Sequence, residues 1–152
     1  MEQTRVESWR TMEVEPIYQE LAEQIEGEPR WAIPRLLKLM IPLEEARIVR
    51  EFPAPAEVVA ETLNLPIEQV EMTQKRLLRK GVCTKNTEGH VRIIWTLFQL
   101  ADLGWINPEF DEEYGEEFFQ MLEFFRKSPD FARYYNGVVR PEGERTQTFR
   151  VV

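Results

Sequence analysis

The chain contains very few of the residues that usually carry chemistry. Its 152 residues include one cysteine, Cys83, and one histidine, His90. A single cysteine rules out an internal disulfide and fits a reducing compartment. One cysteine and one histidine are too few to build a Cys/His zinc site or to hold an iron–sulfur cluster. We therefore expect no metal ion and no cofactor in this chain.

Long apolar segments are missing as well. No run reaches the roughly 18 apolar residues that a membrane span needs, and residues 1–7 lack the apolar centre of a signal peptide. We therefore expect a cytoplasmic protein that does not contact membranes. The sequence also shows no nucleophile paired with a base, no glycine-rich phosphate loop and no set of metal ligands, so we expect no enzymatic activity.

Charge is distributed unevenly along the chain. The net charge is −8, but residues 31–97 are mildly basic, whereas residues 1–30 and 98–130 are strongly acidic. A protein that binds DNA tightly normally presents a basic face over its whole domain. The charge distribution therefore disfavours nucleic acid as a partner without excluding it.

The most informative pattern lies between residues 55 and 96. Two short helices, 55–63 and 67–80, are separated by the turn Asn64–Pro66, and Gly81 ends the second helix. Two apolar segments, 82–85 and 90–95, then flank a turn that contains Gly89. This order predicts a mainly α protein with a winged helix-turn-helix, a small β-hairpin wing, and flanking N- and C-terminal helices.

The remaining segments extend this unit on both sides. We expect a flexible arm over 1–14, an N-terminal helical extension over 15–41, the winged helix-turn-helix over 42–97, an acidic, aromatic-rich helical extension over 98–137, and an extended tail over 138–152. The tail ends on an apolar pair, which suggests that it leads into a missing downstream domain.

Polar residues of the second helix and of the wing are candidates for contacts with nucleic acid. They are Gln69, Thr73, Lys75, Arg76, Arg79, Lys85, His90 and Arg92. Glu68 and Glu71, however, lie in the amino-terminal half of this helix, which DNA readers direct at base edges, and they would repel phosphates. The alternative is a solvated helix face with acids first and bases last, as the helix dipole favours. We favour the second reading.

Aromatic residues are unusually dense in the predicted helix 108–127. Six of them are candidates for a partner interface: Phe110, Tyr114, Phe118, Phe119, Phe124 and Phe125. Adjacent helical residues point about 100° apart, so one member of each neighbouring phenylalanine pair lies off the core face. We expect this helix to pack on the winged helix with one side and on a second chain or domain with the other. The alternative is that all the rings lie in the core.

Parts of the sequence resemble a known family. Residues 36–49, 55–60 and 66–82, together with the ending Thr148–Val152, are similar to the N-terminal winged-helix region of ferredoxin-type 4Fe-4S binding proteins of anaerobic microbes. In that family the region precedes cysteine-rich cluster motifs. This chain has no such cysteine series, so no site residue is carried over. A 4Fe-4S cluster is expected only in a missing downstream domain.

Two functions compete at this stage. The first is a winged-helix protein-interaction or scaffolding module, associated with an iron–sulfur electron-transfer protein, that has no chemistry of its own and binds a protein partner or forms a homodimer. The second is a winged-helix transcription regulator that binds DNA through the 67–80 helix and the wing.

Overall fold

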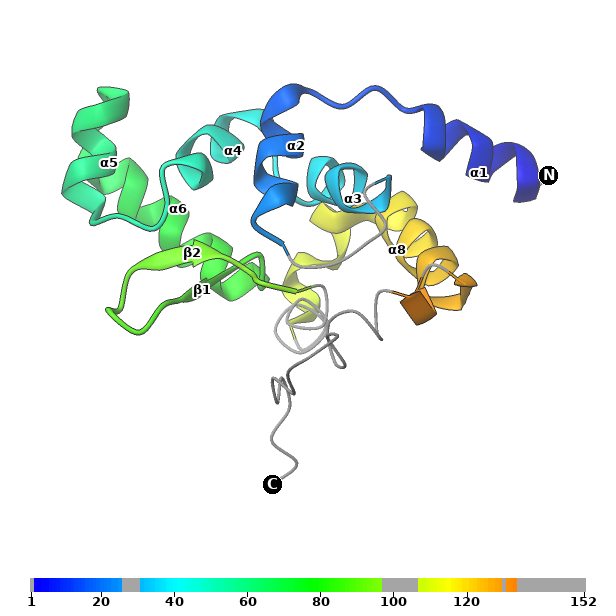
Figure 1. Cartoon of the computed structure of the whole chain (residues 1–152). Helices are drawn as coiled ribbons and strands as arrows, with labels where there is room; N and C mark the ends of the chain where they lie inside the picture. Colours follow the sequence, from blue (N-terminus) through cyan, green and yellow to red (C-terminus); the bar gives the residue numbers. More distant parts are fainter. Residues whose placement is uncertain (1, 26–30, 97–106, 130, 134–152) are drawn as a thin grey trace, which may run out of the picture.

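A computed structural model describes residues 2–25, 31–96, 107–129 and 131–133 of the chain. Six helices come first: α1 (Glu2–Thr11), α2 (Pro16–Glu23), α3 (Ala32–Met40), α4 (Leu43–Arg50), α5 (Ala56–Leu63) and α6 (Ile67–Lys80). They are followed by the strands β1 (Cys83–Lys85) and β2 (Val91–Ile93), the 3₁₀ turn η1 (Pro108–Phe110) and the helix α8 (Asp111–Lys127). The expected fold class is confirmed at the level of a mainly helical protein with a small two-stranded antiparallel sheet (Figure 1).

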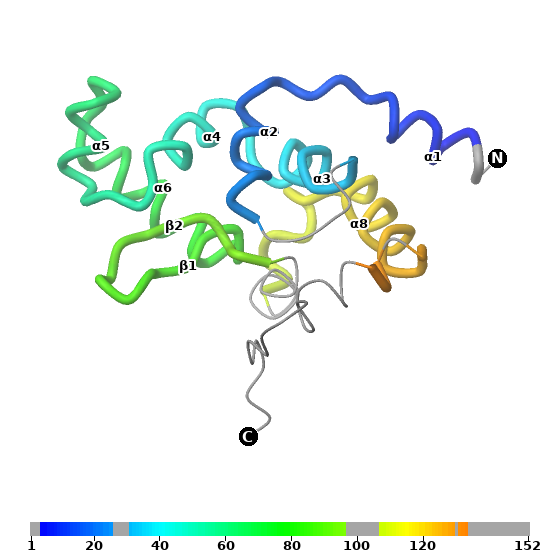
Figure 2. Tube along the Cα trace, in the orientation of Figure 1, coloured from blue at the N-terminus to red at the C-terminus, as the bar shows by residue number. Residues whose placement is uncertain are grey.

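The centre of the core is α3, which packs against α2 on one side and α8 on another. Leu36, Leu37 and Met40 of α3 are fully buried, as are Leu21 of α2 and Phe118 of α8. The α5–α6 pair lies at one end of the molecule with the hairpin beneath it, and α1 lies at the other end (Figure 2). No helix in the described ranges is both long and apolar enough to cross a membrane.

Local backbone signals explain the turn between α5 and α6. Asn64 adopts the left-handed conformation with φ of 53°, and the Leu65 N–H donates to the Ala60 carbonyl. Asparagine tolerates this conformation better than most residues. Pro66 then precedes the first turn of α6, and Gly81, with φ of 84°, ends the helix.

The two strands form a short hairpin in which Cys83 pairs with Ile93 and Lys85 pairs with Val91. The Asn86 side chain holds the turn, because its carbonyl oxygen accepts hydrogen bonds from the backbone N–H groups of Glu88 and His90, at 3.0 and 2.9 Å. The hairpin therefore lies where the sequence predicts it, although both strands are shorter than predicted.

Residues 2–11 differ from expectation, since they form α1 where the sequence suggests a flexible arm. The Trp9 side chain is only 3% exposed, and its indole N–H donates to the Glu117 carboxylate at 3.2 Å. Val6 is the other buried apolar side chain of α1. Two buried positions between Thr4 and Thr11 give too weak a periodicity to be recognised in the sequence. The expectations for 98–106 and for the tail 138–152 fall outside the described residues.

A glycine interrupts α8 near its start. Gly115 has φ of 79° and ψ of 160°, which is not helical, so the turn before it and the helix after it point in different directions. This region of backbone conformation is essentially restricted to glycine. The interruption lets Tyr114 face α6 while Phe118 enters the core against α3.

We predict that Gly115→Ala destabilises the fold by about 1–3 kcal/mol, the usual cost of a side chain in a forbidden backbone region. No atom lies within 4 Å of the added Cβ, so the loss reports the backbone alone. Urea denaturation measures the change. The control, Glu112→Ala at an exposed position of the same helix, should shift stability by no more than about 0.5 kcal/mol. Equal effects of the two substitutions would contradict the prediction.

Candidate functional site

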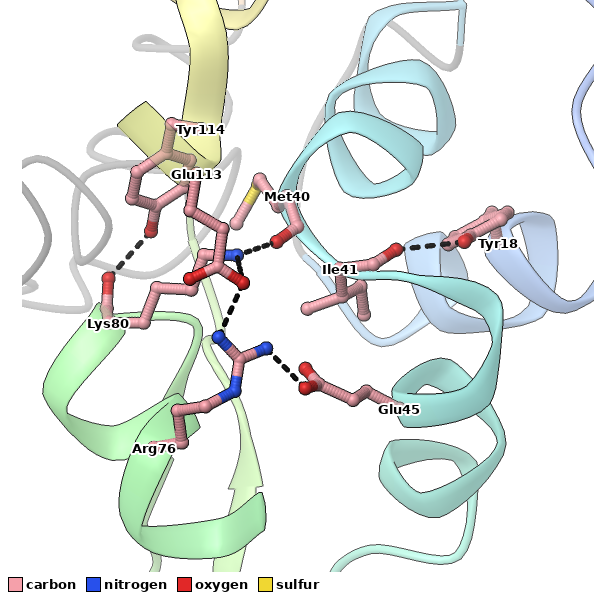
Figure 3. Close-up of polar contacts among 8 residues, drawn as sticks. All are labelled: Tyr18, Met40, Ile41, Glu45, Arg76, Lys80, Glu113 and Tyr114. Atoms are coloured by element: carbon pink, nitrogen blue, oxygen red, sulfur yellow. Dashed lines mark hydrogen bonds and ion pairs between the residues drawn. The ribbon is translucent and has the colours of Figure 1, made fainter. Parts of the chain in front are cut away.

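A polar cluster joins α4, α6 and α8 at the middle of the molecule (Figure 3). It consists of Glu45 from α4, Arg76 and Lys80 from α6, and Glu113 and Tyr114 from α8. The elements that supply these side chains are distant in sequence. The cluster therefore determines how the α5–α6 unit sits on the rest of the protein.

Lys80 is the most deeply buried member, with no exposed surface. Its ammonium donates to the Met40 carbonyl at the end of α3 and lies 3.3 Å from a Glu113 carboxylate oxygen. It also lies 4.9 Å from the centre of the Tyr114 ring, a favourable distance for a cation–π contact. The Tyr114 hydroxyl in turn donates to the Lys80 carbonyl at 2.6 Å.

Arg76 bridges two acids from different helices. Its guanidinium donates to Glu45 and to Glu113, and its side chain is 29% exposed. The other carboxylate oxygen of Glu45 is buried and accepts no hydrogen bond from the described residues. Arg76 is thus the cation that neutralises Glu45 within this part of the structure.

Burial and charge pairing shift the pKa values of Lys80 and Glu113 in opposite directions. Burial lowers the pKa of Lys80, and the negative charge of Glu113 offsets only part of that shift. Burial alone would raise the pKa of Glu113. The hydrogen bond from Arg76 and the charges of Lys80 and Arg76 outweigh it, so this pKa lies below its ordinary value.

Two of the candidate DNA contacts are occupied in ion pairs. Arg76 belongs to the polar cluster, and Arg79 donates to both carboxylate oxygens of Glu109. The sequence analysis places both arginines on the outward face of the helix. In the structure, Arg76 instead points toward α4 and α8, while Arg79 stays exposed but paired.

Three other candidates meet around a small pocket of about 320 Å³ between α6 and the hairpin. Lys75 and Lys85 are exposed and form no ion pair in the described structure. His90 lies 3.5 Å from a Glu88 oxygen. Glu71 also lines this pocket, so the cations do not form an uninterrupted basic surface.

The remaining candidates are scattered. Gln69 is exposed and Thr73 is half-buried on α6. Arg92 stacks over the Trp95 ring at 4.6 Å and donates to the Ile93 carbonyl. The structure therefore brings Lys75, Lys85 and His90 together and leaves the other five candidates outside their pocket.

The solvent-facing side of the α5–α6 pair is acidic. It exposes four carboxylates: Glu57, Glu61, Glu68 and Glu71. Val58 and Met72, which are 49% and 68% exposed, lie on the same two helices. Phosphate groups would be repelled from such a surface.

The aromatic candidates divide into two groups. Four are buried: Phe110, Tyr114, Phe118 and Phe125. Phe119 and Phe124 are half-buried and line a groove of about 1400 Å³, which we call the α1–α8 groove. One member of each neighbouring pair thus lies off the core face. The helix packs mainly on α3 rather than on the predicted winged helix, to which the polar cluster connects it.

The α1–α8 groove combines an apolar floor with charged ends. Trp9, Phe119, Leu122 and Phe124 supply its apolar surface, and Trp9 and Phe124 are in ring contact at 5.9 Å. Asp111, Glu112 and Glu116 line the end near the start of α8, whereas Glu123, Arg126 and Lys127 line the other end. Arg5 of α1 also lines the groove and donates to the Gln120 side chain. The groove is open and larger than the roughly 300–1000 Å³ typical of small-molecule pockets.

The single cysteine and histidine do not meet. Cys83 is buried on β1, and this burial raises the pKa of its thiol. His90 follows the hairpin turn. Within the described ranges, no group of three or more His, Cys, Asp or Glu side chains is arranged to hold a metal ion.

Of the five residues of the polar cluster, only Arg76 and Tyr114 were candidates from the sequence. Glu45, Lys80 and Glu113 were given no role from the sequence. Acids and bases at helical spacing look the same in the sequence whether they face water or another helix. No local signal could have identified them.

Comparison with protein-family models, with curated proteins and with solved structures finds no match for this chain.

We predict that Arg76→Met lowers the free energy of unfolding by about 1–3 kcal/mol, a value between those for exposed and for buried ion pairs. The substitution leaves Glu45 and Glu113 without their shared cation. Lys75→Met, at the adjacent exposed position, is the matched control and should change stability by no more than about 0.5 kcal/mol. Urea denaturation of both variants tests this, and equal losses would show that the cluster contributes nothing.

The stability of the protein should also depend on pH through Glu113. The pKa of Glu113 is lowered in the folded state, so its contribution to stability is present above the ordinary value of 4.5 and is lost as the pH falls through the folded pKa. Glu113→Gln should therefore lose less stability than the parent protein between about pH 5 and pH 3. Thermal melts across this range measure the difference. Glu112→Gln, which removes an unpaired neighbour, should retain the parent slope.

Proposed function

We propose that the chain is a protein-interaction or scaffolding module built on a winged helix, with no chemistry of its own. The order α4, α5, α6, β1 and β2 supports this proposal, because a winged helix has helices followed by a β-hairpin; in the proposal α6 is the recognition helix and the hairpin is the wing. Winged helices bind proteins as well as DNA, so the surfaces must decide between these roles.

The carrying observation is that Arg76 and Lys80 of α6 are used inside the protein. Arg76 and Arg79 pair with acids from α4, η1 and α8, and Lys80 is fully buried. The exposed face of α5 and α6 then carries Glu68 and Glu71 beside the free Lys75. A helix with these charges is poorly suited to the DNA backbone.

The α1–α8 groove supports a protein partner. Phe119 and Phe124 line the groove, because the core holds only one member of each neighbouring phenylalanine pair. Covering a large apolar side chain gains about 1.5–3 kcal/mol when burial is complete. Open apolar surfaces with a polar rim are typical of binding sites for other proteins.

A narrower form of the proposal follows from the family resemblance. In it, the module scaffolds or docks an iron–sulfur electron-transfer protein, and the cluster is bound by another domain or another chain. Cys83, the one cysteine of the chain, is buried on β1. Its thiol is therefore not presented to a cluster at the surface.

DNA binding by a transcription regulator is the second candidate, and one observation favours it. Lys75, Lys85 and His90 gather between α6 and the hairpin, where a winged helix approaches the DNA backbone. The candidate has a smaller basic surface than DNA readers normally present.

The test is a selection of random peptides displayed on phage against the immobilised chain, with fluorescence anisotropy of duplex DNA fragments in parallel. We expect peptides whose binding weakens at least about tenfold in Phe119→Gln. The double variant Lys75→Glu, Lys85→Glu should retain that binding. Melting temperatures confirm that both variants fold.

Two outcomes would contradict the proposal. One is the absence of any peptide whose binding depends on Phe119. The other is a dissociation constant for DNA of about 10⁻⁸ M or tighter at physiological salt, lost in Lys75→Glu, Lys85→Glu and kept in Phe119→Gln. That pattern would establish the DNA-binding candidate instead.

A further inference from the structure

Helix α1 lies at one end of the molecule and is attached to it by few contacts (Figure 1). Residues 12–15 connect α1 to α2 and form neither helix nor strand. Between Thr4 and Thr11, the side chains of Val6 and Trp9 are buried and the others are exposed. A helix of this length is marginal in water by itself, so the position of α1 depends on the contacts of these few side chains.

Trp9 is the residue that anchors α1 to α8. Its indole N–H donates to the Glu117 carboxylate at 3.2 Å, and its ring centre lies 5.9 Å from that of Phe124. One turn earlier, Arg5 donates to the Gln120 side chain at an exposed position. We call Glu117, Gln120 and Phe124 the α1 seat.

Three side chains of α1 that face the rest of the protein share one side of the helix. Val6 precedes Trp9 by three residues and Arg5 precedes it by four, and residues at these spacings are neighbours on a helix. An amphipathic helix bound in a groove of another protein uses anchors at the same spacings. Tryptophan is enriched among such anchors, because it combines a large apolar ring with one hydrogen-bond donor. Helix α1 therefore contacts α8 in the manner of a peptide ligand.

Open space borders the contact between α1 and its seat. Arg5 and Trp9 line the α1–α8 groove of about 1400 Å³. A second cavity of about 740 Å³ is lined by Thr4 and Ser8 of α1 and by Glu116 of α8, among others. A segment with few buried apolar side chains opens locally at a lower free energy than the core does.

Two polar contacts add to this attachment from the start of α3. Arg35 donates to the Arg10 carbonyl at 2.7 Å, and the Arg10 guanidinium lies 5.3 Å from the centre of the Trp31 ring. The hydrogen bond is exposed, so water replaces it at little cost. Helix α3 itself is held differently, since Leu36 and Leu37 are fully buried. We therefore expect α1 to leave its seat far more often than α3 leaves the core.

We propose that α1 is a detachable strap that covers a helix-binding site on α8, and that a partner helix takes its place there. The partner has the chemistry that α1 shows on this site: a tryptophan, an aliphatic residue three positions before it and an arginine four positions before it. The inference rests on the proposed function, since it names the partner and the contact that the partner displaces. Phe124 belongs both to the α1 seat and to the α1–α8 groove, so a partner in the groove competes with α1.

Glu117 makes the site selective for tryptophan. Among the described residues it forms no ion pair, and it accepts the indole N–H of Trp9. A phenylalanine in the place of this tryptophan would keep the ring contact with Phe124 but would offer the carboxylate no donor. We therefore expect phenylalanine to bind about three- to tenfold more weakly than tryptophan.

Hydrogen exchange of the full chain measures how readily α1 opens. We expect the α1 amides to be protected only about 100-fold relative to an unstructured chain, and the α3 amides at least about tenfold more. Trp9→Ala should remove the protection of α1 and leave that of α3 in place. Glu7→Ala, at an exposed position of α1, is the matched control and should keep the parent pattern.

A labelled synthetic peptide of residues 2–14 tests the site in trans by fluorescence anisotropy. An attached helix competes at an effective concentration of about 1 mM, so closure of about 100 to 1 corresponds to a dissociation constant of about 10 μM for the free peptide. We expect this value for the Trp9→Ala chain and at least about tenfold weaker binding to the parent, whose own α1 fills the seat. The peptide with Trp9→Ala should not bind, and the peptide with Trp9→Phe should bind with intermediate affinity.

Three results would overturn the inference. The α1 amides of the parent chain could exchange as slowly as those of α3, which decides the question even if Trp9→Ala fails to fold. The peptide could bind neither chain, or it could bind the parent and the Trp9→Ala chain equally.

The phage selection separates this inference from the proposed function. If selected peptides bind through Phe119 while α1 exchanges as slowly as α3, the groove binds a partner beside a fixed α1 and only the strap fails. If the peptide of residues 2–14 binds the Trp9→Ala chain as expected and no selected peptide depends on Phe119, the helix-binding site is supported and the proposed function fails.

Discussion

The burial of the Lys80 ammonium is the constraint on which the arrangement of the helices depends. A charged amine without exposed surface is tolerated only if hydrogen bonds and an opposite charge replace its water shell. The Met40 carbonyl and the Glu113 carboxylate supply them, and the Tyr114 ring lies beside the charge. These groups come from α3 and α8, so the carboxyl end of α6 is tied to both helices. The polar cluster therefore links the α5–α6 unit and its hairpin to the helical core.

The same pairing determines what the surface can bind. Arg76 satisfies acids that belong to α4 and α8, so it is not available to phosphates, whereas Arg79 pairs with Glu109 of η1 at an exposed position. What remains outside on α5 and α6 is mostly carboxylate. Part of the positive charge that would favour DNA, on Arg76 and Lys80, is used inside the fold. This coupling between core and surface is the physical reason for preferring a protein partner.

The sequence predicts well those features that local residues determine. Pro66, Gly81 and the Asn86 turn set the limits of α6 and of the hairpin, and each acts through the backbone of its own neighbourhood. The polar cluster was not predictable in this way. Arg76 pairs with residues 31 and 37 positions away, and Lys80 with one 40 positions away. Helix α1 was missed for a related reason, because its place depends on Trp9 contacting a helix more than 100 residues later.

The aromatic residues of α8 are too closely spaced along the helix for all of them to lie in the core. Adjacent positions on a helix cannot share one face, so Phe118 and Phe125 enter the core while Phe119 and Phe124 pack half-buried at its edge. Gly115 adds a second direction, since it turns Tyr114 toward Lys80 before the regular helix begins. The result is a helix with three occupied sides: one in the core, one on the polar cluster and one in the groove. The aromatic density of this helix therefore exceeds the capacity of a single core face.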